Sequence, residues 1–213
     1  MLTRVRNRIA AQHLLWKSRR AYSVETELGP LLVMPGVLDP VATKVGAWLA
    51  RAMIREVQAG ERWVDMGCGT GVVGLAMASA GAEVVCADVD PACVRNARAN
   101  GAMRGLGLRA VESDLFGALD TLAGAHGVVY NAPFWPGEGR GLAFGRAMYA
   151  GADFEAIRRY PPEAFRFGAR RTLIALSEAG REHAGALAAF GPHRRLLRER
   201  VGGEWLVLLE AGS

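Results

Sequence analysis

The sequence predicts one α/β domain in which helices cover both faces of a mostly parallel β-sheet. Its 213 residues are the usual size of a single α/β domain. Hydrophobic residues make up 51% and charged residues 22%, which excludes a disordered or fibrous protein. From residue 63 onward, short apolar segments alternate with helical patterns. Such alternation requires crossover connections and therefore a buried, mostly parallel sheet.

Periodicity and turn residues predict the elements in chain order. A helix is expected over residues 3–20 and a short strand at 31–34, with a break at Gly29-Pro30 between them. Asp39-Pro40 predicts the start of a helix that runs to about Val57, because Asp caps free amides and Pro suits a first turn. Further strands are predicted at residues 63–66, 83–87, 108–112, 126–130, 171–176 and 205–209. Further helices are predicted through residues 75–78, from 91 to about 100, and at 154–167 and 178–190.

Basic residues are concentrated at the N-terminus. The first 24 residues contain no acid and six basic side chains, namely Arg4, Arg6, Arg8, Lys17, Arg19 and Arg20. The formal charge is +5, so the remainder of the chain is at −1. The sequence therefore predicts a basic helical arm or lid over residues 1–30, ahead of a near-neutral domain over residues 31–213.

Cysteine usage and hydropathy predict a cytoplasmic protein. The three cysteines have no CxxC spacing, which suggests neither a disulfide framework nor a zinc site, and no metal site is expected. No apolar run approaches the roughly 18 residues of a membrane span, so no membrane partner is expected. The N-terminus does not read as a secretory signal.

The strongest functional signal is a glycine-rich loop at residues 65–71, between a predicted strand and a predicted helix. Glycines there allow a sharp turn and let a ligand approach amides at the helix N-terminus. Residues 69–74 also fit the GxGxxG pattern of dinucleotide binders, so a nicotinamide-dependent oxidoreductase is an alternative. Asp65, just ahead of the glycines, would meet a pyrophosphate unfavourably. It suits a cationic ligand or, through a bridging group, the ammonium of an amino acid.

Two further acids follow the next two strands. Asp88 ends its strand and can take both hydroxyls of a ribose. Asp90 competes for this role, but its position before Pro91 indicates a helix cap instead. Asp114 can accept a hydrogen bond from an adenine amino group, while Leu115 offers its backbone amide to the ring. These spacings provide one carboxylate for each part of S-adenosylmethionine.

In this order, the three segments resemble the class I S-adenosylmethionine-dependent methyltransferases over roughly residues 31–210. The resemblance implies a Rossmann-like fold with a mostly parallel seven-stranded sheet whose last strand is antiparallel. It also implies an enzyme with S-adenosyl-L-methionine as cofactor. The cofactor-binding residues would be Asp65, Gly67, Cys68, Gly69, Gly71, Asp88, Val89, Asp114, Leu115 and Asn131.

The segment Asn131-Ala132-Pro133-Phe134 follows the fourth strand of the predicted sheet. It resembles the (N/D)PP(Y/F) signature of methyltransferases that alkylate a planar or exocyclic nitrogen, which implies that these four residues are catalytic. In that family the Asn oxygen and the next carbonyl accept the two N–H bonds of the target, and the aromatic ring stacks on the substrate. Ala132 replaces a proline here, but its carbonyl remains available.

Residues 32–40 narrow the resemblance to the "small domain" branch. That branch contains HemK-like release-factor glutamine methyltransferases and the guanine-N2 ribosomal RNA enzymes. Its Pro-Gly-Val-Phe-x-Pro stretch corresponds to residues 35–40, which would line the cofactor and substrate entrance. Residues 149–153 fall where the family often has a glycine-rich loop.

The expected acceptor is a small amine, amide or amino acid, because only about 30 residues precede the catalytic core. The N-terminal helix would then act as a lid. The predicted substrate-binding residues are Trp16, Tyr22, Pro35, Val37, Phe134 and Trp135. Ribosomal RNA or protein glutamine is the alternative acceptor, bound through the basic arm and a second group of arginines at Arg194, Arg195, Arg198 and Arg200. A non-catalytic binding subunit with a methyltransferase fold is a further alternative.

Overall fold

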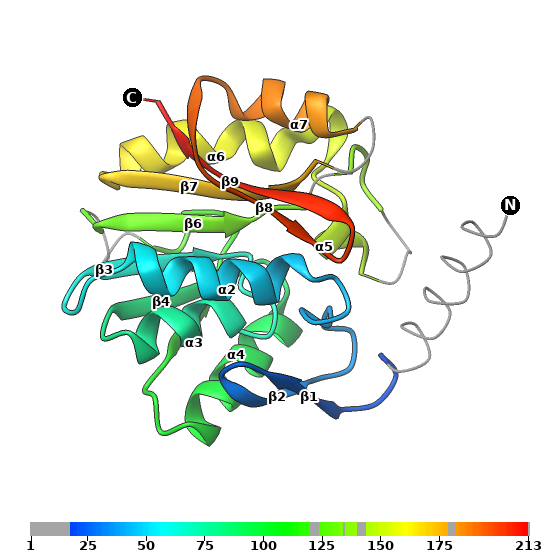
Figure 1. The fold of residues 1–213 in the computed structure, drawn as a ribbon, viewed down its shortest axis with the longest axis vertical. Helices are drawn as coiled ribbons and strands as arrows, with labels where there is room; N and C mark the ends of the chain where they lie inside the picture. Colours follow the sequence, from blue (N-terminus) through cyan, green and yellow to red (C-terminus); the bar gives the residue numbers. More distant parts are fainter. Residues whose placement is uncertain (1–17, 120–123, 134, 140–143, 179–181, 213) are drawn as a thin grey trace, which may run out of the picture.

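The predicted strands form one seven-stranded sheet in the computed structural model, which describes residues 18–119, 124–133, 135–139, 144–178 and 182–212 (Figure 1). The strand order is β5-β4-β3-β6-β7-β9-β8. The five strands from β3 to β7 pair in parallel, and β9 runs antiparallel to both of its neighbours. The predicted mixed sheet with an antiparallel last strand is confirmed. The bounds are Arg62–Met66 (β3), Glu83–Asp88 (β4), Arg109–Glu112 (β5), Gly127–Asn131 (β6), Arg171–Ser177 (β7), His193–Val201 (β8) and Glu204–Ala211 (β9).

Helices cover both faces of this sheet. Alternate residues of a strand point to opposite faces, so Trp63 packs with one apolar cluster while Val64 and Met66 pack with another. The first cluster includes α2, α3 and α4, and the second includes α6 and α7. Figure 1 shows α6 and α7 together at the top of the view, and α2, α3 and α4 in its lower half. The helices are α2 (Val45–Glu56), α3 (Val72–Ser79), α4 (Pro91–Met103), α5 (Gly145–Met148), α6 (Glu155–Phe167) and α7 (Glu182–Phe190), with a 3₁₀ turn at Ala152–Phe154.

A β-hairpin precedes the sheet. Its strands are β1 (Tyr22–Thr26) and β2 (Gly29–Val33), so the predicted strand at 31–34 has a partner that the sequence analysis missed. The Thr26 hydroxyl closes the turn, since it donates to the Gly29 carbonyl at 2.7 Å and accepts from the Leu28 amide at 3.2 Å. The boundary expected at residue 30 therefore falls inside the hairpin.

Two buried asparagines of α4 hold this hairpin beside the glycine loop. Asn96 accepts from the Met34 amide and donates to the Leu32 carbonyl, at 2.8 and 2.9 Å. Asn100 accepts from the Leu32 amide at 2.8 Å and donates to the Thr70 carbonyl at 2.9 Å. Each amide thus satisfies backbone groups that have no strand partner on that side, which anchors β2 to α4 (Figure 1).

The start predicted for α2 at residue 40 is wrong by five residues. Asp39 does cap free amides, because its carboxylate accepts from the amides of Val41 and Ala42 at 2.9 and 3.0 Å. These amides belong to an isolated turn, and Lys44 then adopts a positive φ of 66° that interrupts the helical path. The helix begins only at Val45.

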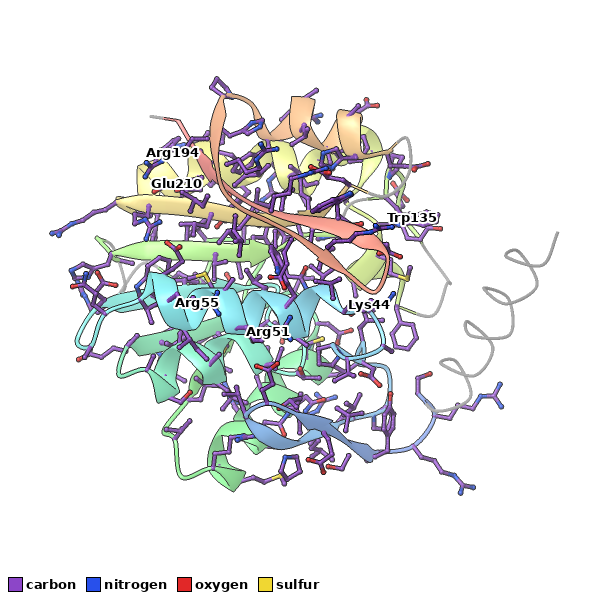
Figure 2. All side chains as sticks on the ribbon, in the orientation of Figure 1. Lys44, Arg51, Arg55, Trp135, Arg194 and Glu210 are labelled. Carbon is purple, nitrogen blue, oxygen red and sulfur yellow. The ribbon has the colours of Figure 1, made fainter. Side chains whose placement is uncertain are left out.

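The strand β8 was also missed, and it contains the four C-terminal arginines. Arg194 pairs with Glu210 at 2.7 Å, and Arg198 pairs with Glu178 at the same distance. Figure 2 shows Arg194 and Glu210 together at one end of the molecule, away from Trp135. Two of the arginines expected to bind phosphate therefore have carboxylate partners.

The predicted helix over residues 3–20 lies almost wholly outside the described residues, together with Trp16, Arg4, Arg6, Arg8 and Lys17. The helix predicted over 178–190 begins at Glu182 in the described part of the chain, after residues 179–181. Among the described helices, none has the length and apolar character needed to cross a membrane.

Candidate active site

A cavity of about 990 Å³ opens at the carboxyl edge of the sheet. At this point the chain that leaves β3 continues to β4 on one side, and the chain that leaves β6 continues to β7 on the other side. Open α/β sheets bind ligands where the strand order reverses in this way. Its volume lies at the upper end of the range for ligand pockets. Ten of the predicted site residues line it, namely Asp65, Gly67, Cys68, Gly69, Asp88, Val89, Asp114, Leu115, Asn131 and Pro133.

The glycine loop forms one wall of the cavity. Gly67 has a positive φ of 63°, and a Cβ at this position would come within 2.8 Å of the Tyr130 ring. A Cβ on Gly69 would meet no atom within 4 Å. Gly71 does not line the cavity, because it begins α3 and packs against α4, where a Cβ would be 2.9 Å from that of Ala97. The contact of Gly71 with the cofactor stays a prediction.

Asp88 stands at the end of β4 with its carboxylate braced by backbone amides. One oxygen accepts from the Gly69 amide and the other from the Asp90 amide, both at 2.9 Å. Burial raises the pKa of Asp88, and these two amides oppose the shift. Each carboxylate oxygen can accept more than one hydrogen bond, so both retain capacity for a ligand. The neighbouring Asp90 accepts from the Ala92 amide at 2.8 Å and caps α4, as predicted.

Asp65 lies behind the glycine loop and is only 1% exposed. Its carboxylate accepts from the Gly74 amide at 2.8 Å, and the Cys86 thiol lies at 3.8 Å. The side chain that the sequence assigns to a cationic ligand thus holds the first turn of α3. Burial, partly offset by the Gly74 amide, raises the pKa of Asp65 from 3.8 to about 7.

The raised pKa of Asp65 predicts how the free energy of unfolding depends on pH. The folded protein binds a proton at Asp65 that the unfolded chain has already lost, so the free energy of unfolding falls as the pH rises from about 4 to about 7. In Asp65→Asn this component of the pH dependence should disappear, because an amide oxygen still accepts from Gly74 but does not ionise. Denaturant unfolding of the cofactor-free protein across this pH range measures it. The matched control is Asp90→Asn, which keeps the cap of α4. Parallel pH profiles for Asp65→Asn and the wild type would contradict the assignment.

The turn after β5 forms the opposite wall. Leu115 has a positive φ of 46°, and the Ser113 hydroxyl donates to its carbonyl at 2.7 Å. Asp114 is exposed and pairs with Arg159 of α6 at 3.2 Å. Arg159 also lines the cavity. Arg159 was not among the predicted site residues, since no local sequence pattern links it to a segment 45 residues away.

Asn131 is the last residue of β6 and lies opposite Ala175 of β7 in the sheet register. It is half-buried and lines the cavity. Its side-chain amide has no hydrogen-bond partner in the described part of the chain. Ala132 and Pro133 follow and are buried, whereas Phe134 lies outside the described residues.

The entrance segment differs in detail from the prediction. Gly36, Leu38 and Pro40 line the cavity, whereas Val37 is 1% exposed and belongs to the core. Val37, which the sequence assigns to the substrate, is thus a core residue in this structure, and its contact with a substrate stays a prediction. Pro35 is exposed and Tyr22 donates to Asp39 at 3.1 Å, and neither is among the residues that line the cavity.

The remaining wall of the cavity comes from residues 138–156, of which the sequence pointed only to a glycine-rich loop at 149–153. The lining residues there are Glu138, Gly139, Phe144, Ala147, Tyr149, Ala150, Gly151, Glu155 and Ala156. Across the whole cavity, the described charged lining residues are one arginine, Arg159, and the acids Asp65, Asp88, Asp90, Asp114, Glu138 and Glu155. This acidic lining favours cationic groups and N–H donors over anions. Within the described ranges, no group of three or more His, Cys, Asp or Glu side chains is placed to hold a metal ion.

Comparisons with known proteins agree with this geometry. The model of a family described as methyltransferase small domain matches residues 44–155. The ribosomal RNA small subunit methyltransferase C of Chromohalobacter salexigens is 30% identical over 152 residues, which cover 71% of this chain and 38% of that protein. The release factor glutamine methyltransferase of Deinococcus radiodurans is 34% identical over 121 residues, which cover 50% of this chain and 41% of that protein. The chain thus spans about two fifths of the length of these relatives.

A solved structure shares the fold. It is a T. thermophilus 16S rRNA N2 G1207 methyltransferase in complex with AdoMet and guanosine, with a TM-score of 0.59 and 23% identity. The match covers 91% of this chain and 50% of that one. At this identity the likeness establishes a common fold.

Proposed function

Because the chain belongs to the methyltransferase small domain family, we propose that it transfers a methyl group from S-adenosylmethionine to the exocyclic amino group of a guanine in RNA. The proposal rests on Asn131, which stands at the carboxyl end of β6 with its side chain beside the cavity. S-Adenosylmethionine is the methyl donor of this family, and its sulfonium provides an activated methyl group for in-line displacement. The acidic lining suits the positive charges of this cofactor.

The chain's own residues would bind and orient the two reactants. Asp88 would accept from the ribose hydroxyls of the cofactor, and the turn at Asp114 and Leu115 would meet its adenine. Asn131 and the carbonyl of Ala132 would accept the two N–H bonds of the acceptor nitrogen. Holding both bonds turns the nitrogen lone pair toward the methyl group, so catalysis is mainly positioning. As the nitrogen–carbon bond forms, the sulfur–methyl bond would break and S-adenosylhomocysteine would leave. The methylated nitrogen would then release one proton to water.

RNA replaces the small metabolite as our preferred acceptor. The two curated relatives described above are named for ribosomal RNA and for a release factor. The expectation of a metabolite depended on a short chain, but the chain spans only part of its relatives. Guanine presents adjacent N–H donors, which suit an acid-lined cavity. The phosphates of the RNA backbone do not suit this cavity, so the base would leave its stack and enter the cavity alone.

A glutamine side chain of a protein is the second candidate, because the release factor relative is 34% identical. Its amide also has two N–H bonds for Asn131 and Ala132 to accept. It lacks the further ring N–H of guanine.

Labelled methyl transfer distinguishes these acceptors. The protein is incubated with radiolabelled S-adenosylmethionine and either an unmodified 16S rRNA transcript or a purified translation release factor. We expect label in the RNA and N2-methylguanosine after digestion to nucleosides. Label confined to glutamine of the release factor would replace the RNA proposal with the second candidate.

A further inference from the structure

We propose that Trp135 and Tyr149 form a stacking platform at the mouth of the cavity, which holds a nucleotide adjacent to the target guanine. The inference rests on the proposed RNA function and goes beyond it, since it concerns a neighbouring base and not the base that is methylated. Trp135 is not among the residues that line the cavity, so it lies outside the pocket for the acceptor.

The two rings connect the inside of the cavity with its rim. Tyr149 lines the cavity, and its ring centroid lies 6.1 Å from that of Trp135, with the ring planes 57° apart. Trp135 is 41% exposed, among the highest values for a large apolar side chain in the described residues. Figure 2 shows Trp135 at the margin of the molecule, on the side opposite to Arg194 and Glu210. The Trp135 ring therefore lies beside a residue of the cavity wall and reaches the protein surface.

Backbone pairing holds the platform in place. The Trp135 amide donates to the Met148 carbonyl at 3.1 Å, and the Ala150 amide donates to the Trp135 carbonyl at 2.8 Å. Gly137 and Gly151 then exchange two hydrogen bonds, each of 2.9 Å. These four bonds form two isolated bridges between the segments 135–137 and 148–151, one parallel and one antiparallel. Because the backbone is fixed, stacking on Trp135 would cost little additional ordering.

The chemistry of the surroundings selects a base over a phosphate. Glu138, on the segment that follows Trp135, and Glu155 both line this part of the cavity, and Glu155 lies 4.0 Å from Arg159. A carboxylate offers no hydrogen-bond donor to a phosphate. An aromatic ring instead offers an apolar face on which any base can stack. Once the target guanine occupies the cavity, the chain of an RNA continues through the mouth. Its next nucleotide is then the nearest group able to cover Trp135.

The test measures binding of a short single-stranded RNA with one guanine to protein saturated with S-adenosylhomocysteine. Trp135→Ala should raise the Kd about tenfold, as expected for the loss of one base–aromatic stack. Replacing the base on one side of the guanine with an abasic residue should weaken wild-type binding by a similar factor. For the Trp135→Ala protein, the Kd of the abasic RNA should equal the Kd of the intact RNA. Abasic residues are placed on the two sides in separate RNAs.

Three controls accompany this comparison. Trp205→Ala removes a tryptophan of similar exposure, 39%, which lies on β9 against Arg198, and it should leave the Kd unchanged. Trp135→Phe should retain most of the affinity. Free guanosine, which has no neighbouring base, should bind the wild type and Trp135→Ala equally, and unchanged S-adenosylhomocysteine affinity reports an intact fold.

Two outcomes overturn the proposals separately. In the first outcome, the wild type binds the RNA and labels the transcript, but the abasic neighbour raises the Kd of Trp135→Ala as much as that of the wild type. The platform is then wrong and the proposed function stands. If the wild type neither binds the RNA nor labels the transcript, the RNA function is wrong and the platform falls with it.

Discussion

Replacing Asn131 with alanine is expected to lower kcat by at least about a hundredfold, and by far more than it weakens the binding of S-adenosylhomocysteine. The side-chain oxygen would accept one N–H bond of the acceptor nitrogen, and without it the lone pair is no longer held toward the methyl group. The fold should tolerate the change, because Asn131 is half-buried at a strand end. Single-turnover methyl transfer to the 16S rRNA transcript measures the rate, and calorimetry measures the affinity.

The matched variant is Asn131→Asp, which keeps an oxygen acceptor at the same position. It should retain more activity than Asn131→Ala, because the (N/D)PP(Y/F) signature that this segment resembles accepts either residue. An Asn131→Ala protein that turns over at the wild-type rate would remove Asn131 from the acceptor site.

Replacing Asp88 with alanine is expected to weaken S-adenosylhomocysteine binding by about a hundredfold or more. A charged carboxylate that accepts two ribose hydroxyls accounts for two hydrogen bonds of about 1.5–3 kcal/mol each. The substitution also removes the acceptor for the Gly69 amide, which faces the cavity in the glycine loop. Calorimetric titration of the purified protein gives the change in Kd.

The neighbouring acid provides the control for this second prediction. Asp90→Ala removes the cap of α4 and should cost about 1 kcal/mol of stability, with little change in cofactor affinity. If Asp90→Ala lost affinity and Asp88→Ala kept it, the ribose contact would move from Asp88 to Asp90.

Local patterns were sufficient for most of the core. Strands β3, β4, β6 and β7 were predicted within about one residue at each end, because short buried, mostly apolar segments are bounded by turns. β8 was missed because its sequence, HRRLLRERV, has no exposed–buried alternation and pairs with β9 through a bulge at Arg195/Leu197. The early start given to α2 has a similar cause, since the break at Lys44 depends on its positive φ and not on a helix-breaking residue.

The sequence by itself determined the sheet class, the glycine loop and the acids at successive strand ends. Parallel strands place their carboxyl ends at one edge, so the chain order of Asp65, Asp88 and Asn131 already brings them to one site. Only the tertiary structure decided what surrounds them. In the folded chain Arg159 forms an ion pair with Asp114, Val37 lies in the core, and the rings of Trp135 and Tyr149 are in contact. Those contacts depend on how distant segments pack, and the periodicity of either segment alone contains no information about its partner.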